Sequence, residues 1–175
     1  EGSLRALVFR TGSANWTNVE SAAGTVPLNT LMFGAFTFDD AATPEARLFT
    51  GTFAAPLSEV SYSVQLDGSG AIDDDAGADV YAGNLQRAPT LSFKGTIARY
   101  GVIKRPVQPY ELRTLCEAAM HSRDIQDCNV PGTVLLCEPY GLGPVIDHSG
   151  MGNGGTITAA VAAAHLQLRG TTRQE

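Results

Sequence analysis

Hydrophobic and polar residues alternate most strictly between positions 58 and 66 of this 175-residue chain. Every second side chain in this segment is apolar, and the side chains between them are polar. A period of two residues predicts a β-strand with one buried face and one solvated face. The residues assigned to the buried face are Val60, Tyr62, Val64 and Leu66.

Further strands are predicted where β-branched and aromatic residues are concentrated between turn-forming residues. They cover residues 3–10, 30–38, 46–53, 90–103 and 133–138. Segment 30–38 is apolar on both faces, so we expect it to be buried or covered. Residues 11–23 are rich in Ser, Thr, Asn and Gly, which predicts a loop with Trp16 as its anchor. Residues 39–45 are predicted to form a turn and 139–155 a long glycine-rich loop.

Residues 109–123 depart from the β pattern and predict one short α-helix. Their apolar residues fall on one helical face, with Pro109 in the first turn, where proline is tolerated. The members of this face are Leu112, Leu115, Cys116, Ala119 and Met120. The last segment, 156–169, fits both periods: its alanine content favours a helix, whereas its alternating end favours a strand. We interpret it as a strand.

Taken together, these elements predict an all-β fold with about eight strands. The expected architecture is a two-sheet antiparallel β-sandwich, similar to a jelly roll, with the single helix at 109–123. A chain of 175 residues is long enough to bury a core without metal or disulfide support, so one domain over residues 1–175 is expected.

Composition and charge limit the classes of partner. The net charge is −6, and no basic cluster exceeds Lys104-Arg105, so the sequence does not indicate nucleic-acid binding. No apolar run approaches the ~20 residues that span a bilayer, so no membrane association is predicted. Only two of the twelve basic residues are lysines, a composition that suits a surface covered by partners or by copies of the same chain. The alternative is a codon bias in a GC-rich source.

An acidic, glycine-rich stretch between residues 67 and 79 is the strongest candidate for a metal site. Its aspartates are Asp67, Asp73, Asp74, Asp75 and Asp79. Several carboxylates on a flexible loop could provide the six to eight oxygen ligands that calcium prefers. The stretch departs from the EF-hand pattern, because Ala71 occupies a ligand position and no glutamate closes the loop. The alternative is a solvated hairpin tip whose charge blocks edge pairing.

Other motifs are poor candidates for chemistry. Residues 150–155 fit the glycine pattern of a dinucleotide-binding loop, but the nearest predicted strand ends at Glu138. The acidic residue that the motif needs would be Glu175, with no second strand to hold it. Residues 147–149 (Asp-His-Ser) contain the residue types of a catalytic triad, yet adjacent residues cannot converge as a triad does. The spacing of Cys116, Cys128 and Cys137 does not match a zinc site and predicts buried thiols. We therefore predict that the protein is not an enzyme.

The order of the late elements resembles the end of the jelly-roll shell domain of small icosahedral virus coat proteins. The matching features are the helix at 109–123, a strand that begins Val130-Pro131-Gly132, a glycine-rich loop and a last segment that ends in alternating apolar residues. This resemblance covers the last third of the chain. It implies a capsid subunit, located in the virion, that assembles with copies of itself and with other virion proteins. In that family an acidic loop often binds calcium between subunits, which implies a test of residues 73–79. No basic arm like those that hold RNA in many coats is found.

The predicted function is thus a non-catalytic, self-assembling structural component of a virus particle. Two alternatives remain: a carbohydrate- or ligand-binding β-sandwich module, and a phage tail or decoration protein. The carbohydrate alternative requires a row of exposed aromatic residues. The candidates for such a row are Trp16, Tyr100, Tyr110 and Tyr140. A hydrolase at residues 147–149 is the weakest alternative.

Overall fold

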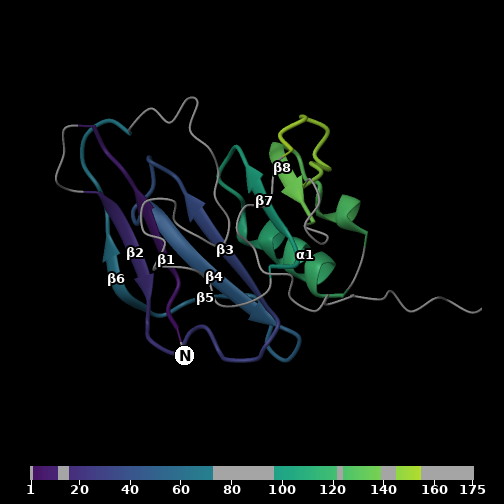
Figure 1. Cartoon of the computed structure of the whole chain (residues 1–175). Helices are drawn as coiled ribbons and strands as arrows, with labels where there is room; N and C mark the ends of the chain where they lie inside the picture. The colour runs from purple at the N-terminus through teal and green to yellow at the C-terminus, as the bar shows by residue number, and fades with distance from the viewer. Residues whose placement is uncertain (1, 12–15, 73–96, 122–123, 139–144, 155–175) are drawn as a thin grey trace, which may run out of the picture. The chain divides into compact units, whose positions relative to one another are not determined.

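The computed structural model describes residues 2–11, 16–72, 97–121, 124–138 and 145–154, and these residues are mostly β (Figure 1). They form eight strands in antiparallel sheets and one α-helix, which confirms the predicted all-β, sandwich-like class. The elements are β1 (Arg5–Val8), β2 (Thr17–Ser21), β3 (Met32–Phe38), β4 (Ala46–Thr52), β5 (Ser58–Glu59), β6 (Tyr62–Leu66), β7 (Tyr100–Ile103), α1 (Pro109–Met120), the 3₁₀-helix η1 (Ile125–Cys128) and β8 (Thr133–Cys137).

The chain divides into two compact units, each with its own internal contacts. The first unit comprises Glu1–Ala76 and Arg105–Met120, and the second comprises Gly77–Lys104 and His121–Glu175. That residues 1–175 form one domain stays a prediction.

Two three-stranded sheets face each other in the first unit. Their strand orders are β1-β2-β6 and β3-β4-β5, and all neighbouring strands are antiparallel. The inner faces meet at Val19, Ala46 and Leu48, which are almost completely buried. Partly buried residues pack around these three: Leu4, Ala6, Phe38, Val60 and Tyr62. Burial of apolar side chains between two sheets is what stabilises a β-sandwich.

The strand predicted over residues 58–66 is divided between the two sheets. β5 pairs with β4, whereas β6 pairs with β2. The register of the β2–β6 pair shifts opposite Glu20 and Ser21, where Ser63 is the extra residue and donates its hydroxyl to the Ser21 carbonyl at 3.0 Å. A β-bulge of this kind reverses the faces on which the following side chains lie. Val60 and Tyr62 therefore face the core as predicted. The prediction is wrong for Val64 and Leu66, which lie opposite Glu20 and Asn18 on the outer face; Leu66 has 58% of its surface exposed.

The prediction of a loop over residues 11–23 is wrong for its second half, because Thr17–Ser21 form β2, the central strand of its sheet. Thr17 and Ser21 point into the sandwich and are buried. Their hydroxyl groups have partners there: Thr17 donates to Glu45 at 2.6 Å, and Ser21 accepts from the Leu4 amide at 2.9 Å. Buried polar groups are tolerated when they are hydrogen-bonded, which is why a strand of loop-like composition is stable here.

Helix α1 confirms the helical prediction and begins at Pro109 as expected. Its buried residues are Leu112, Leu115, Cys116, Ala118 and Met120, so Ala118 takes the buried place that was assigned to Ala119. At the N-terminus, Glu111 accepts the Gln108 amide at 3.0 Å, as in a capping box, and pairs with Arg105 at 2.5 Å. The Arg105 hydrogen bond is the main cause that lowers the pKa of Glu111 to about 2.

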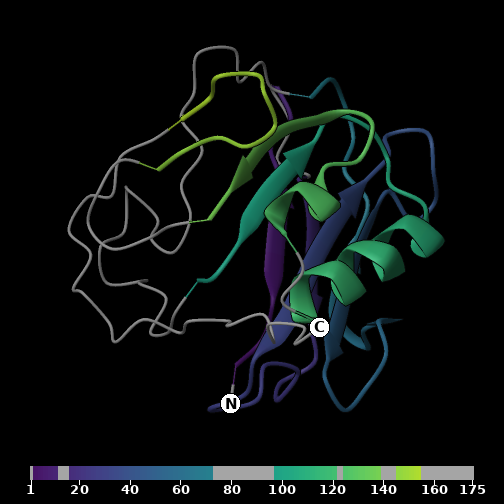
Figure 2. The same ribbon diagram turned by 90° about the vertical axis from the view of Figure 1, so that its right-hand side faces the viewer.

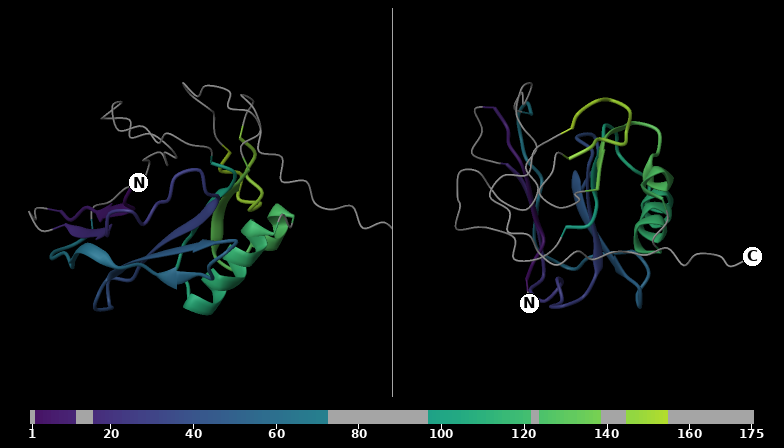
Figure 3. Two further views of the ribbon diagram at one scale, coloured as in Figure 1. Left: turned by 90° about the horizontal axis from the view of Figure 1, so that it is seen from below. Right: turned by 45° about the vertical axis from the view of Figure 1, so that its right-hand side comes forward.

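The helix covers the face of the β3-β4-β5 sheet that points away from the first sheet (Figure 2, Figure 3). Along β4, Ala46 and Leu48 face the other sheet, while Phe49 and Gly51 lie on the helix side and are also buried. β4 is therefore buried on both faces. β3 lies at the edge of the described sheet and none of its residues is fully buried, so the expectation of a buried strand holds only in part.

The second unit contains the β7–β8 pair, in which Tyr100 lies opposite Cys137 and Val102 opposite Leu135. Leu135, Cys137 and Val145 form its small buried cluster, with Tyr100 packed against them. Strand β8 confirms the prediction for 133–138, and β7 confirms the end of the segment 90–103. The predicted strand at 156–169 lies outside the described residues.

The close approach of helix and sheet at Gly51 predicts a specific packing defect. An added Cβ would lie 2.8 Å from the Cys116 sulfur, so Gly51→Ala should lower the free energy of unfolding by about 1–3 kcal/mol through overpacking. Cys116→Ala removes that sulfur, so the double variant should recover part of the loss. Gly34→Ala is the matched control, because the nearest atom to its Cβ is 3.8 Å away. Denaturant titration of the four variants measures the difference. Additive losses for Gly51→Ala and Cys116→Ala would contradict this packing.

Candidate functional site

A buried arginine is the centre of the largest polar cluster in the first unit. Arg10 is only 4% exposed. It forms ion pairs with Asp40 and Glu45, both at 2.6 Å, and donates to the Gly70 carbonyl at 2.9 Å. The ring of Phe38 lies 5.7 Å from the guanidinium carbon. A charge with so little access to water is stable only when it is paired in this way.

Glu45 is the shared acceptor of this cluster. Its Oε2 atom accepts from the Arg10 guanidinium, from the Thr17 hydroxyl at 2.6 Å and from the Gly68 amide at 3.2 Å. Burial alone would raise the pKa of Glu45, but these three hydrogen bonds outweigh it and lower the pKa. The hydrogen bond to Asp40 is the largest cause that raises the pKa of Arg10. Both groups therefore stay charged, and their role is structural. We call this cluster, formed by Arg10, Thr17, Asp40, Glu45 and Gly68, the joint.

Gly68 packs directly against the other residues of the joint. A Cβ at Gly68 would lie 2.7 Å from the Thr17 hydroxyl and 2.8 Å from Arg10 Nε. Arg10 Nε is buried and makes no hydrogen bond, which fits its position against the glycine backbone. The cluster thus joins the end of β1, the start of β2, the turn between β3 and β4, and the segment after β6. The sequence carried one signal of it, because Arg10 is in phase with the apolar residues of segment 3–10.

The outer face of the β1-β2-β6 sheet carries an exposed apolar patch. It is formed by Leu7, Phe9, Trp16 and Leu66, which we call the outer patch. The rings of Phe9 and Trp16 meet edge to face with centroids 4.8 Å apart. These two side chains are 49% and 45% exposed, and Leu66 is 58% exposed. Trp16 was expected to anchor the loop at 11–23, and in the structure its ring packs against Phe9 on the outer face.

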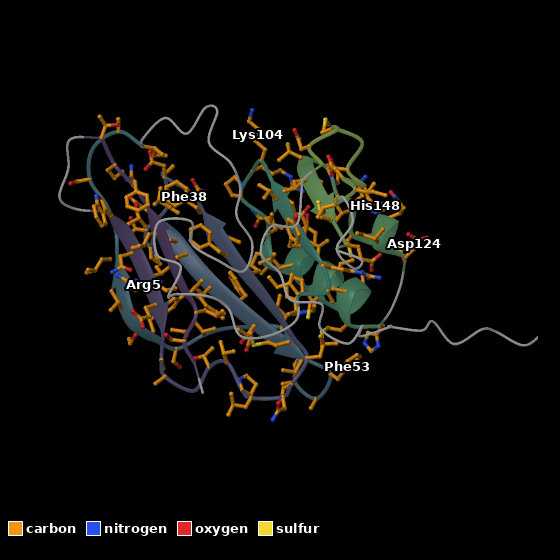
Figure 4. The ribbon with its side chains drawn as sticks, in the orientation of Figure 1. Arg5, Phe38, Phe53, Lys104, Asp124 and His148 are labelled. Carbon is orange, nitrogen blue, oxygen red and sulfur yellow. The ribbon has the colours of Figure 1, made fainter. Side chains whose placement is uncertain are left out.

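Charged and polar residues border the outer patch at one end. Arg5 and Glu20 lie opposite each other on β1 and β2, with 3.9 Å between Arg5 Nε and Glu20 Oε2. Arg5 also donates to Asn18 at 3.2 Å, and Ser3 donates to Glu20 at 3.0 Å. Figure 4 shows Arg5 on the side of this sheet that faces away from β3 and β4. An apolar patch with a polar border is the usual composition of an interaction surface.

The predicted calcium site is described only at Asp67. Its Oδ1 atom accepts the Glu45 amide at 2.8 Å, so this carboxylate contacts the joint at Glu45. Asp73, Asp74, Asp75 and Asp79 lie outside the described residues. Within the part of the chain that is described, no three His, Cys, Asp or Glu side chains are grouped to hold a metal ion. Calcium binding stays a prediction.

Asp147 organises the loop that follows β8 and does not form a triad with its neighbours. Its Oδ1 accepts the amides of Leu136 at 3.0 Å and Ser149 at 2.9 Å, and its Oδ2 accepts the Ser149 hydroxyl at 2.8 Å and the Asn153 amide at 2.9 Å. Burial alone would raise the pKa of Asp147, but these hydrogen bonds lower it to about 2. The backbone amide of His148 donates to the Leu136 carbonyl at 2.7 Å. The residue types of the triad are therefore used to hold a loop.

The remaining candidates are accounted for as follows. Gly150 and Gly152 adopt positive φ angles of 84° and 76°, which fits the interpretation of the glycine pattern as a loop. All three cysteines are free and buried, as predicted, and burial raises the pKa of each thiol.

The proposed aromatic row is not found among the described residues. Trp16 belongs to the first sheet, whereas Tyr110 lies on α1, which covers the second sheet. Tyr100 is partly buried against Cys137 in the other unit, and Tyr140 is not described.

Comparison of the chain with models of protein families, with curated proteins and with solved structures found no match. In the described part of the chain, no helix has the length and hydropathy needed to cross a bilayer.

The hydrogen bonds to Asp147 predict a pH-dependent loop. Because its folded pKa is about 2 and its ordinary value is 3.8, Asp147 stabilises the fold above pH ~4, and this contribution is lost as the pH falls through about 2. The protection factors of the Ser149 and Asn153 amides against hydrogen exchange should therefore fall in that interval. Asp147→Asn should lower these protection factors at neutral pH and remove their change between pH ~4 and about 2, whereas Asp127→Asn, at an exposed position, should leave them as in wild type. Equal protection in Asp147→Asn and wild type would disprove this role.

Proposed function

We propose that this protein is a non-catalytic structural subunit that assembles with copies of itself, as a component of a virus particle. The observation that carries the proposal is the outer patch, in which aromatic and aliphatic side chains remain exposed although the sandwich has a filled interior. Large exposed apolar surfaces are uncommon on monomers, because water contact with them is unfavourable.

A further feature supports assembly. β3 is an edge of its described sheet, seven residues long, and has neither a charged residue nor a proline. Such edges readily pair with other chains unless they are covered. The assignment to a virus particle rests on the order of the late elements in the sequence.

A carbohydrate- or ligand-binding module is the second candidate, and the exposed ring of Trp16 favours it. Aromatic rings on a sheet surface can stack on flat apolar ligands. The two candidates differ in one measurable property, which is the dependence of the molecular mass on protein concentration.

The proposal predicts that the purified chain forms species heavier than the monomer, with an average mass that rises with concentration. Light scattering over a concentration series measures this mass, and parallel series with calcium and with a chelator test the acidic segment. Loosening of the assemblies by the chelator would support the calcium site. A monomer at every concentration, with or without calcium, would contradict the proposed function.

Leu66→Lys is the variant that tests the outer patch. It should weaken association at least tenfold, because loss of an interface anchor costs about 2 kcal/mol. Tyr110→Lys is the control, since Tyr110 is 69% exposed on α1, away from the outer patch. If both variants associate as strongly as wild type does, the contact between copies lies outside the outer patch.

A further inference from the structure

The outer face of the β1-β2-β6 sheet carries two rows of side chains with different chemistry. The first row contains the charged residues Arg5 and Glu20, which lie opposite each other on β1 and β2, and Val64, which lies opposite Glu20 on β6. The second row is aromatic and contains Phe9 and Trp16, whose rings are in contact. Between the rows, Leu7 and Leu66 lie on either side of Asn18. One end of this face is therefore polar, and the other end is apolar.

We propose that this face binds the same face of a second copy of the chain, with a two-fold axis parallel to the strands and midway between β1 and β2. This inference rests on the self-association proposed above and specifies how the two copies are arranged. In a two-fold interface the same surface is used by both copies, so the surface must be complementary to itself. An axis parallel to the strands places each row opposite the same row of the second copy, and two sheets packed in this way are aligned as in a sandwich.

The aromatic row is self-complementary, because Phe9 and Trp16 meet the same two rings and lose contact with water. An axis across the strands would instead place the aromatic row of one copy against the charged row of the other. The charges would then lose hydration without gaining a partner, which is unfavourable. The distribution of charge thus favours the axis parallel to the strands over the axis across them.

The charged row is self-complementary because Arg5 and Glu20 have opposite signs and lie on neighbouring strands. With the axis midway between β1 and β2, Arg5 of one copy lies across from Glu20 of the other, and the reverse pair forms on the other side of the axis. Within one chain the two groups are 3.9 Å apart and their side chains are 54% and 32% exposed. This loose pairing leaves both groups accessible to a second copy.

A mixing experiment tests the geometry. In Arg5→Glu both charged residues of the first row are negative, and in Glu20→Arg both are positive. Each variant alone should therefore associate at least tenfold more weakly than wild type, because like charges meet across the axis. An equimolar mixture of the two variants should associate again, since a negative row then faces a positive row. Sedimentation velocity on the separate variants and on the mixture gives the three affinities.

Arg47→Glu and Glu59→Arg are matched controls. Arg47 and Glu59 form a similar exposed pair, 3.6 Å apart, on the other sheet. These variants should associate as wild type does, separately and mixed. Far-UV circular dichroism verifies that each variant keeps its fold.

The outcomes separate this inference from the proposed function. Suppose that wild type associates as expected. The two-fold arrangement alone would then be overturned if the charge variants associate as well as wild type, or if their mixture stays monomeric. Wild type that stays monomeric at every concentration would overturn the proposed function as well.

Discussion

The buried ion pair between Arg10 and Glu45 is the contact on which the arrangement of the first unit depends. It joins four separate segments at one end of the sandwich, and Glu45 also satisfies the hydroxyl of Thr17. It also determines what lies outside, because neighbours along a strand point to opposite faces. With Arg10 and Thr17 held inside, Phe9 and Trp16 must project outward. The interior joint therefore places the exposed aromatic pair.

The sequence predicted the elements whose stabilising contacts are local or strongly periodic. Helix α1 follows from the spacing of Leu112, Leu115 and Cys116, and β4 follows from its composition. The joint could not be predicted, because Arg10 and Glu45 are 35 residues apart and nothing in the pattern pairs them. For the same reason β2 was mistaken for a loop, since the partner that makes Thr17 suitable for a buried strand lies 28 residues further along the chain.

The outer patch could not be predicted from the sequence either. Strict alternation assigned Leu66 to the core, and only the bulge at Ser63 moves it to the outer face. Register shifts of one residue leave no mark in a hydrophobic pattern, yet they exchange the two faces of a strand. This exchange gives the sheet an apolar outer surface, which is the physical basis for proposing a structural subunit. Asp147 and Ser149, two of the residue types found in catalytic triads, hold the loop that follows β8.

The central claim is that the Arg10–Glu45 pair holds the first unit together. A double-mutant cycle with Arg10→Met and Glu45→Gln, followed by denaturant titration, tests it most directly. The coupling energy between these residues should clearly exceed that of the exposed pair Arg47 and Glu59, measured in the same way, because the buried pair is shielded from water and screened less. A coupling energy no larger than that of the exposed pair would contradict the account.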